Sequence, residues 1–181
     1  MKKPQTYNRT AIFLHWLIAL GIIGTFAVGF YMQGLPLSPN KLQLYSWHKW
    51  AGITLLILAV VRLAWRLSHP APALPDSMGT ISRLAAHAGH WVLYGLMLAI
   101  PMSGWLMSSA QGFPVVWFGI LPLPDLVAKN AELGELLKNA HVILNYILLI
   151  TLLGHVGAAL HHHFIKKDNV MSRMLPIVHN K

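Results

Sequence analysis

Residues 141–164 read HVILNYILLITLLGHVGAALHHHF, a nearly unbroken apolar stretch that carries histidine at positions 141, 155 and 162. As a helix rising about 1.5 Å per residue, it is long enough to cross a hydrocarbon layer of about 30 Å. Each helical residue turns by about 100°, so steps of 14 and 7 residues return to within about 40° and 20° of the starting direction. The three histidines therefore share one face, and such a stripe is costly inside a membrane unless it meets partners.

Three more apolar stretches have a similar length. Only 10% of the 181 residues are charged and 55% are hydrophobic, whereas soluble domains carry about 25% charged residues. We therefore predict an all-α integral membrane protein, a four-helix bundle that forms a single domain over residues 1–181. The expected spans are about 12–32, 50–67, 91–109 and 142–164.

The connections between these spans differ in character. Residues 34–47 form a short link, and residues 68–86 contain a proline-rich run that breaks helices. Residues 110–140 form the longest link. Its second half, Asp125 to Lys138, interleaves charges with leucine and valine, which predicts a short interfacial helix.

Lysine and arginine are distributed unevenly across the predicted membrane. Ten lie on the side of the two chain ends: Lys2, Lys3, Arg9, Arg62, Arg66, Arg83, Lys166, Lys167, Arg173 and Lys181. Four lie on the other side: Lys41, Lys49, Lys129 and Lys138. The excess of positive charge predicts that both termini lie on the cytoplasmic side of an inner membrane. The formal charge of +9 is thus a topology signal and a contact for anionic lipid, and we expect no nucleic-acid partner.

Histidines on other predicted helices match the depths of those in the fourth span. His15 lies near the inner end of the first span, at the depth of His155, and His48 lies at the outer start of the second span, at the depth of His141. A cofactor plane fits between two such imidazoles, as is common in helical bundles. The pairs predict two haem b groups, with His15 and His155 as axial ligands of the inner iron and His48 and His141 as ligands of the outer iron. An iron with both axial positions filled favours electron transfer.

Other metal chemistry fits less well. The chain has no cysteine, which excludes iron–sulfur clusters, thiolate zinc sites and covalently attached haem. Zinc would require three or four ligands that converge on one point, whereas these pairs lie at two depths. A haem-free histidine-rich channel or metal carrier stays open as a hypothesis.

Further polar residues gather at the predicted inner end. His87 and His90 share a face at the start of the third span, and His90 matches the depth of His162, so these two could flank an inner cavity or simply lie at the headgroups. Arg62 and Arg66 are one turn apart. They either pair with haem propionates or extend to the lipid headgroups.

Several motifs resemble one family. They are Phe13-Leu-His15-Trp16-Leu17, His48-Lys-Trp-Ala-Gly52, Val61-Arg62-Leu-Ala-Trp-Arg66, Ala86-His87-Ala-Gly-His90, Leu93-Tyr94 and His161-His162-His163-Phe-Ile-Lys-Lys-Asp168-Asn169. Their order and spacing, from about Tyr7 to Pro176, resemble the bacterial cytochrome b561 family of di-haem b-type cytochromes, which includes superoxide oxidase.

The resemblance implies two b haems on the four paired histidines and a ubiquinone site on the cytoplasmic side, at which His90 and His162 would stand. It also implies a superoxide:ubiquinone oxidoreductase or, otherwise, an electron carrier that uses a periplasmic redox partner. The superoxide role is associated with an electropositive outer surface. Here Lys41 and Lys49 are offset by Asp125, Glu132 and Glu135, so we expect a nearly neutral outer loop. The alternative function is that of a haem-containing membrane anchor and electron outlet for a separate soluble oxidoreductase.

Overall fold

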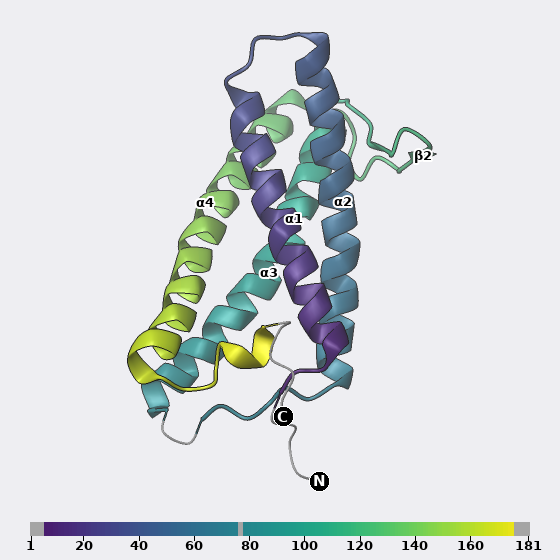
Figure 1. Cartoon of the computed structure of the whole chain (residues 1–181). Coiled ribbons are helices and arrows are strands. Elements are labelled where there is room, and N and C mark those ends of the chain that lie inside the picture. The colour runs from purple at the N-terminus through teal and green to yellow at the C-terminus, as the bar shows by residue number, and fades with distance from the viewer. Residues whose placement is uncertain (1–5, 76–77, 176–181) are drawn as a thin grey trace.

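Four long helices form the bundle in the computed structural model, which describes residues 6–75 and 78–175 (Figure 1). They are α1 (Arg9–Gln33), α2 (Pro39–Ser68), α3 (Thr80–Ala110) and α4 (Ala131–His161). All four are long and apolar enough to cross a membrane, and the last span continues to Lys166. The prediction of an all-α membrane bundle is confirmed.

The last three helices begin about 11 residues, or three turns, before their predicted starts. Local sequence explains where α2 and α4 begin. The Ser38 hydroxyl accepts a hydrogen bond from Lys41 N, with Pro39 at the first helical position, and the Asn130 side chain accepts one from Leu133 N. These are favourable N-terminal caps. The predicted spans start later than the helices because hydropathy marks only the apolar part of each helix.

The connection between α3 and α4 differs from its prediction. Residues 131–138 are the first turns of α4 rather than a separate interfacial helix. Ahead of them, β1 (Val116–Trp117) pairs antiparallel with β2 (Leu121–Pro122), and the turn uses Phe118 and Gly119 at positive φ. The Trp50 and Trp105 indoles donate hydrogen bonds to the Val116 and Pro124 carbonyls, so they fix the hairpin against α2 and α3.

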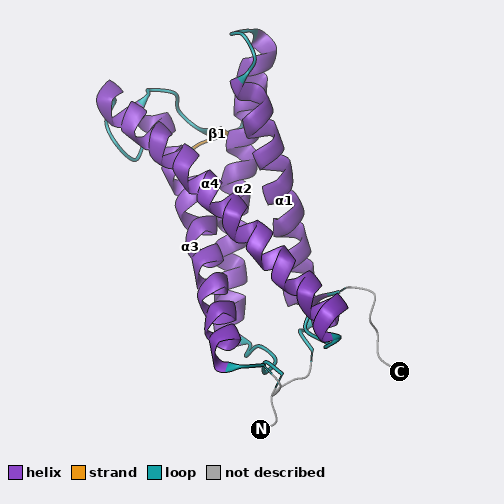
Figure 2. Ribbon diagram, turned by 90° about the vertical axis from the view of Figure 1, so that its left-hand side faces the viewer, coloured by secondary structure: helices purple, strands orange, loops and turns teal. Residues whose placement is uncertain are grey.

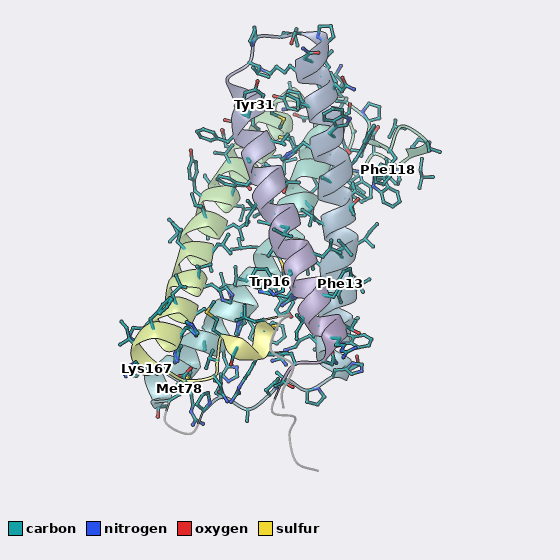
Figure 3. The ribbon with its side chains drawn as sticks, in the orientation of Figure 1. Phe13, Trp16, Tyr31, Met78, Phe118 and Lys167 are labelled. Atoms are coloured by element: carbon teal, nitrogen blue, oxygen red, sulfur yellow. The ribbon has the colours of Figure 1, made fainter. Side chains whose placement is uncertain are left out.

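Beyond α4, the chain forms a π-helical segment, η1 (His162–Lys166), and a short 3-10 helix, η2 (Ser172–Met174). This segment folds back towards the bundle, because Trp16 Nε1 donates a hydrogen bond to the Met174 carbonyl at 2.8 Å. We call the end that holds η2 and the first turn of α1 the terminal end. The opposite end, with the β1–β2 turn, is the hairpin end. Figure 3 shows Lys167 and Met78 at the terminal end and Tyr31 and Phe118 at the hairpin end.

The helices do not all pack against one another. Close packing joins α1 to α2, α2 to α3 and α3 to α4 within the described chain. The α1–α4 and α2–α4 pairs are not among these close contacts, and α4 crosses the bundle obliquely (Figure 2). Large apolar side chains such as Phe30, Leu153 and Ile150 point outwards, 65–72% exposed. Such a surface suits lipid rather than water.

Candidate haem sites

The first pair of histidines lies toward the hairpin end. His48 of α2 and His141 of α4 place their ring centres 6.4 Å apart, with an angle of 80° between the ring planes. An imidazole nitrogen lies about 1 Å from its ring centre and bonds a first-row metal such as zinc at about 2.0–2.1 Å. Two imidazoles on opposite sides of one iron would therefore have ring centres about 6 Å apart. The observed distance fits this arrangement.

The His141 ring is held by α3. Its Nδ1 lies 3.1 Å from the Ile100 carbonyl oxygen and 2.9 Å from the Ser103 hydroxyl, which itself donates to the same carbonyl at 2.7 Å. Because a carbonyl only accepts, we assign the proton of His141 to Nδ1. Nε2 then carries the free lone pair that a metal ligand needs, and such support by a backbone carbonyl is typical of ligating histidines.

Small residues make room around this pair. A Cβ added to Gly29 would lie 3.1 Å from His48 Cε1, and one added to Gly104 would lie 3.2 Å from His141 Cε1. By contrast, a Cβ at Gly52 would meet no atom within 4 Å. Gly52 lines a largely apolar cavity together with both histidines, and its empty volume, including the open side, is about 560 Å³.

The second pair lies toward the terminal end. His15 of α1 and His155 of α4 have ring centres 6.2 Å apart and ring planes at 63°, again close to the spacing of two axial ligands. His90 of α3 also approaches His155, with ring centres 5.5 Å apart. Of these two neighbours, α3 packs directly against α4, whereas the α1–α4 pair is not among the close helix contacts.

Arginine and tyrosine side chains cluster near this second pair, and the charge of Arg62 acts on both of its histidines. Arg62 Nε donates to the Tyr94 hydroxyl at 3.4 Å, and the guanidinium lies 5.8 Å from the centre of the Tyr94 ring. Burial raises the pKa of Tyr7, and the neighbouring charges of Arg66, Arg62 and Arg173 oppose this effect. The cluster is therefore a half-buried, cationic region that would attract carboxylates.

Buried polar atoms without a partner identify where a further group would fit. Among the described residues they are His48 Nδ1, Arg62 Nη1 and Arg173 Nε, although the Thr25 main chain lies beside His48. A buried polar atom left unpaired costs about 1–3 kcal/mol. An anionic group such as a haem propionate would satisfy the two arginines.

The remaining candidates make different contacts. The structure brings His90 to His155, whereas His162 bonds Asp168, with Nδ1 2.5 Å from Oδ2. Arg66 influences Tyr7 through its charge rather than through a hydrogen bond. Sequence reasoning missed Ser103, Tyr7 and the role of Asp168. Asp168 stands out in retrospect as a carboxylate just beyond a histidine run, but its return to His162 depends on how α4 ends.

Taken together, a four-helix membrane bundle with two histidine pairs that fit axial iron ligands defines a b-type membrane cytochrome. The family model described as prokaryotic cytochrome b561 matches residues 6–176. This chain belongs to that family, and it is therefore a multi-pass bacterial membrane protein of electron transfer whose family binds b-type haem.

Individual relatives are similar along almost their whole length. Cytochrome b561 homolog 2 of Escherichia coli (strain K12) is 35% identical over 173 residues, which cover 95% of this chain and 92% of the relative. Cytochrome b561 homolog 1 of the same organism is 31% identical over 174 residues, with coverages of 94% and 97%. Probable superoxide oxidase CybB of Yersinia pestis is 29% identical over 172 residues, with coverages of 95% and 97%.

Proposed function

We propose that the chain is a di-haem cytochrome that transfers electrons across the inner membrane, between a donor or acceptor outside and ubiquinone at the terminal end. His15 and His155 would hold the inner haem b, and His48 and His141 the outer haem b. Bound haem supplies reversible one-electron redox chemistry. The observation that carries the proposal is the pair of ring distances, 6.2 Å and 6.4 Å, at two separate depths.

The separation of 14 positions between His141 and His155 supports two cofactors rather than one. It corresponds to about 21 Å along the axis of α4, too far for a single iron to bind both. Arg62, with its unpaired buried Nη1, and Arg66 would bind propionates at the inner haem.

Haem content tests this assignment. Replacing His141 or His48 by Ala should lower the content from two haems per chain to one, because each variant leaves the inner pair intact. Haem is measured as the pyridine complex per mole of purified protein. Loss of both haems from a folded His141→Ala protein would contradict the pairing.

Ubiquinone is the proposed partner at the terminal end, near His90 and His162. Reduction of a quinone to a quinol requires two electrons and two protons, and histidine can both donate a hydrogen bond and pass on a proton near neutral pH. His90→Ala and His162→Ala should retain both haem spectra but slow electron exchange between haem and quinone by ~10²-fold or more, as for loss of a general acid–base group. Wild-type rates in both variants would remove these residues from the site.

Superoxide is a specific candidate for the outer donor, since one relative is named a probable superoxide oxidase. Each superoxide would give up one electron and leave as dioxygen. Rapid-mixing experiments should then show haem reduction by superoxide that His48→Ala abolishes. A soluble oxidoreductase that copurifies in a fixed ratio, with no reaction of superoxide, would instead favour a membrane-anchor function.

A further inference from the structure

The end of α4 turns the chain back on itself. After the π-helical segment η1, Lys167 adopts a left-handed conformation with φ of 54° and ψ of 36°. Its backbone N–H and that of Asp168 both donate to the His162 carbonyl. This turn reverses the chain direction and places the Asp168 side chain against the His162 ring.

The contact between these two side chains is short and sheltered. His162 Nδ1 lies 2.5 Å from Asp168 Oδ2, and the two side chains are only 17% and 18% exposed. The other carboxylate oxygen, Oδ1, accepts a hydrogen bond from Val170 N at 3.0 Å. Both oxygens are thus engaged, and the carboxylate is fixed relative to the ring.

The charges around the pair favour an ionised carboxylate. Burial alone would raise the pKa of Asp168, but the hydrogen bonds from His162 and Val170 and the charges of His162 and Arg173 hold it below its ordinary value of 3.8. The His161 ring also lies nearby, 5.9 Å from that of His162. An ionised carboxylate only accepts hydrogen bonds. His162 therefore donates through Nδ1, and Nε2 is left for another partner.

We propose that Asp168 is a positioning residue for proton transfer to the quinone. The carboxylate fixes the orientation of the His162 ring and stabilises its protonated form. The proton on Nε2 can then be transferred to a quinone carbonyl oxygen. This inference rests on the proposed function and adds a residue to it. Carboxylates that orient a catalytic histidine in this way recur in unrelated enzymes.

Electrons and protons balance in this transfer. The quinone would take up two protons and two electrons, and a haem held by His15 and His155 would supply the electrons one at a time. One proton leaves His162 Nε2 as the new O–H bond forms, and the imidazole regains a proton from the aqueous phase. The second proton comes from the same aqueous phase, and the product is the quinol.

A purely structural role for Asp168 can be separated from this one. Asn at position 168 retains an acceptor oxygen for Val170 N and the same backbone bond to the His162 carbonyl. It removes the negative charge that stabilises the protonated ring. Asp168→Asn therefore tests the charge, and Asp168→Glu tests the placement, because its carboxylate is displaced by one methylene.

The experiment compares both variants with His162→Gln, and with Asp125→Asn as a control. Asp125 is exposed in the connection ahead of α4, at the hairpin end. Asp125→Asn therefore removes one negative charge, as Asp168→Asn does, but far from His162. Haem–quinone electron exchange is followed by rapid mixing between pH 6 and 9, alongside haem content, spectra and midpoint potentials. We expect Asp168→Asn to keep both haems and their potentials while slowing exchange by ~10-fold or more at neutral pH. The alkaline limb of the pH–rate profile of Asp168→Asn should move to lower pH. The exchange rate and the alkaline limb of Asp168→Glu should lie between those of Asp168→Asn and the wild type.

The outcomes distinguish the two proposals. Slow exchange in His162→Gln with a wild-type rate and pH profile in Asp168→Asn would overturn the role of Asp168 and leave the quinone site intact. Wild-type behaviour in both would contradict the quinone site itself. If Asp168→Asn does not fold, the same measurements on Asp168→Glu test the role of Asp168. In Asp168→Glu, intact haem spectra together with a displaced alkaline limb of the pH–rate profile would support the proposal. An exchange rate and an alkaline limb equal to those of the wild type would overturn it.

Discussion

Two glycines lie where the outer histidines approach neighbouring helices. Gly29 of α1 faces His48 and Gly104 of α3 faces His141, and a Cβ added at either glycine would lie only 3.1 or 3.2 Å from the ring. Glycine in a membrane helix is ordinarily explained by helix–helix packing. Here the close neighbour is an imidazole, so a side chain at either position would press against a histidine ring.

Gly104→Ala should therefore weaken the outer haem. The added methyl group pushes against a ring held by Ile100 and Ser103, and overpacking of this kind costs about 1–3 kcal/mol. Since about 1.4 kcal/mol corresponds to tenfold in affinity, we expect roughly tenfold weaker retention of one haem and normal retention of the other.

Haem content after dilution in detergent measures this effect. Gly95→Ala is the matched control, because it lies on the same helix and its Cβ would meet nothing within 4 Å. Equal haem loss in the two variants would show that the Gly104 contact does not govern haem binding.

Among the helices, sequence predicted the spans better than their ends. Four apolar stretches identify four helices because lipid requires long apolar segments with their backbone hydrogen bonds satisfied internally. The polar turns that precede Trp50, Trp91 and Val142 resemble loops by hydropathy, yet they are helical. The spacing of His141 and His155 predicted their shared face correctly, since both meet histidines of other helices.

Sequence could not predict the environment of His162. A regular helix would continue its side chain along the same stripe as His155. Instead η1 and the left-handed Lys167 end the helix and return Asp168 to it. Neither a π-helical segment nor a lysine at positive φ has a local sequence signature, so this contact follows only from the three-dimensional fold.

The left-handed residue that ends η1 can be tested by substitution. Lys167→Val should disrupt the turn, since a β-branched residue is strongly disfavoured at positive φ. We expect haem–quinone exchange to slow about as much as in Asp168→Asn, with both haems retained. Lys166→Val removes the same charge from the adjacent η1 position and should behave nearly as wild type. Equal rates in the two variants would show that this turn does not support the site.

For the molecule as a whole, orientation decides which compartment each histidine pair serves. The terminal end carries Arg9, Arg62, Arg66, Arg83, Lys166, Lys167 and Arg173 among the described residues, and Lys2, Lys3 and Lys181 lie outside them. We propose that this end is cytoplasmic, in accordance with the excess of positive charge.

A reporter enzyme that is active only in the periplasm tests this orientation. Fused after Lys181, it should be silent, and inserted in the exposed turn at Ile120 it should be active. The two fusions control for each other's expression. A reversed pattern would exchange the compartments of the two histidine pairs and move the quinone site to the outer surface.

The early starts of α2 and α4 have a consequence for electron donors. His48 is nine residues inside α2 and His141 is ten residues inside α4, so the pair lies about 14 Å below the first helical turns. Electron tunnelling through protein weakens steeply with distance. A bulky donor that binds at the helix tips would therefore transfer electrons slowly across this distance. A small molecule that enters between the helices would come closer to the histidine pair and transfer electrons faster. We therefore expect the protruding turns to exclude bulky donors, so that small diffusible reductants are the main electron donors.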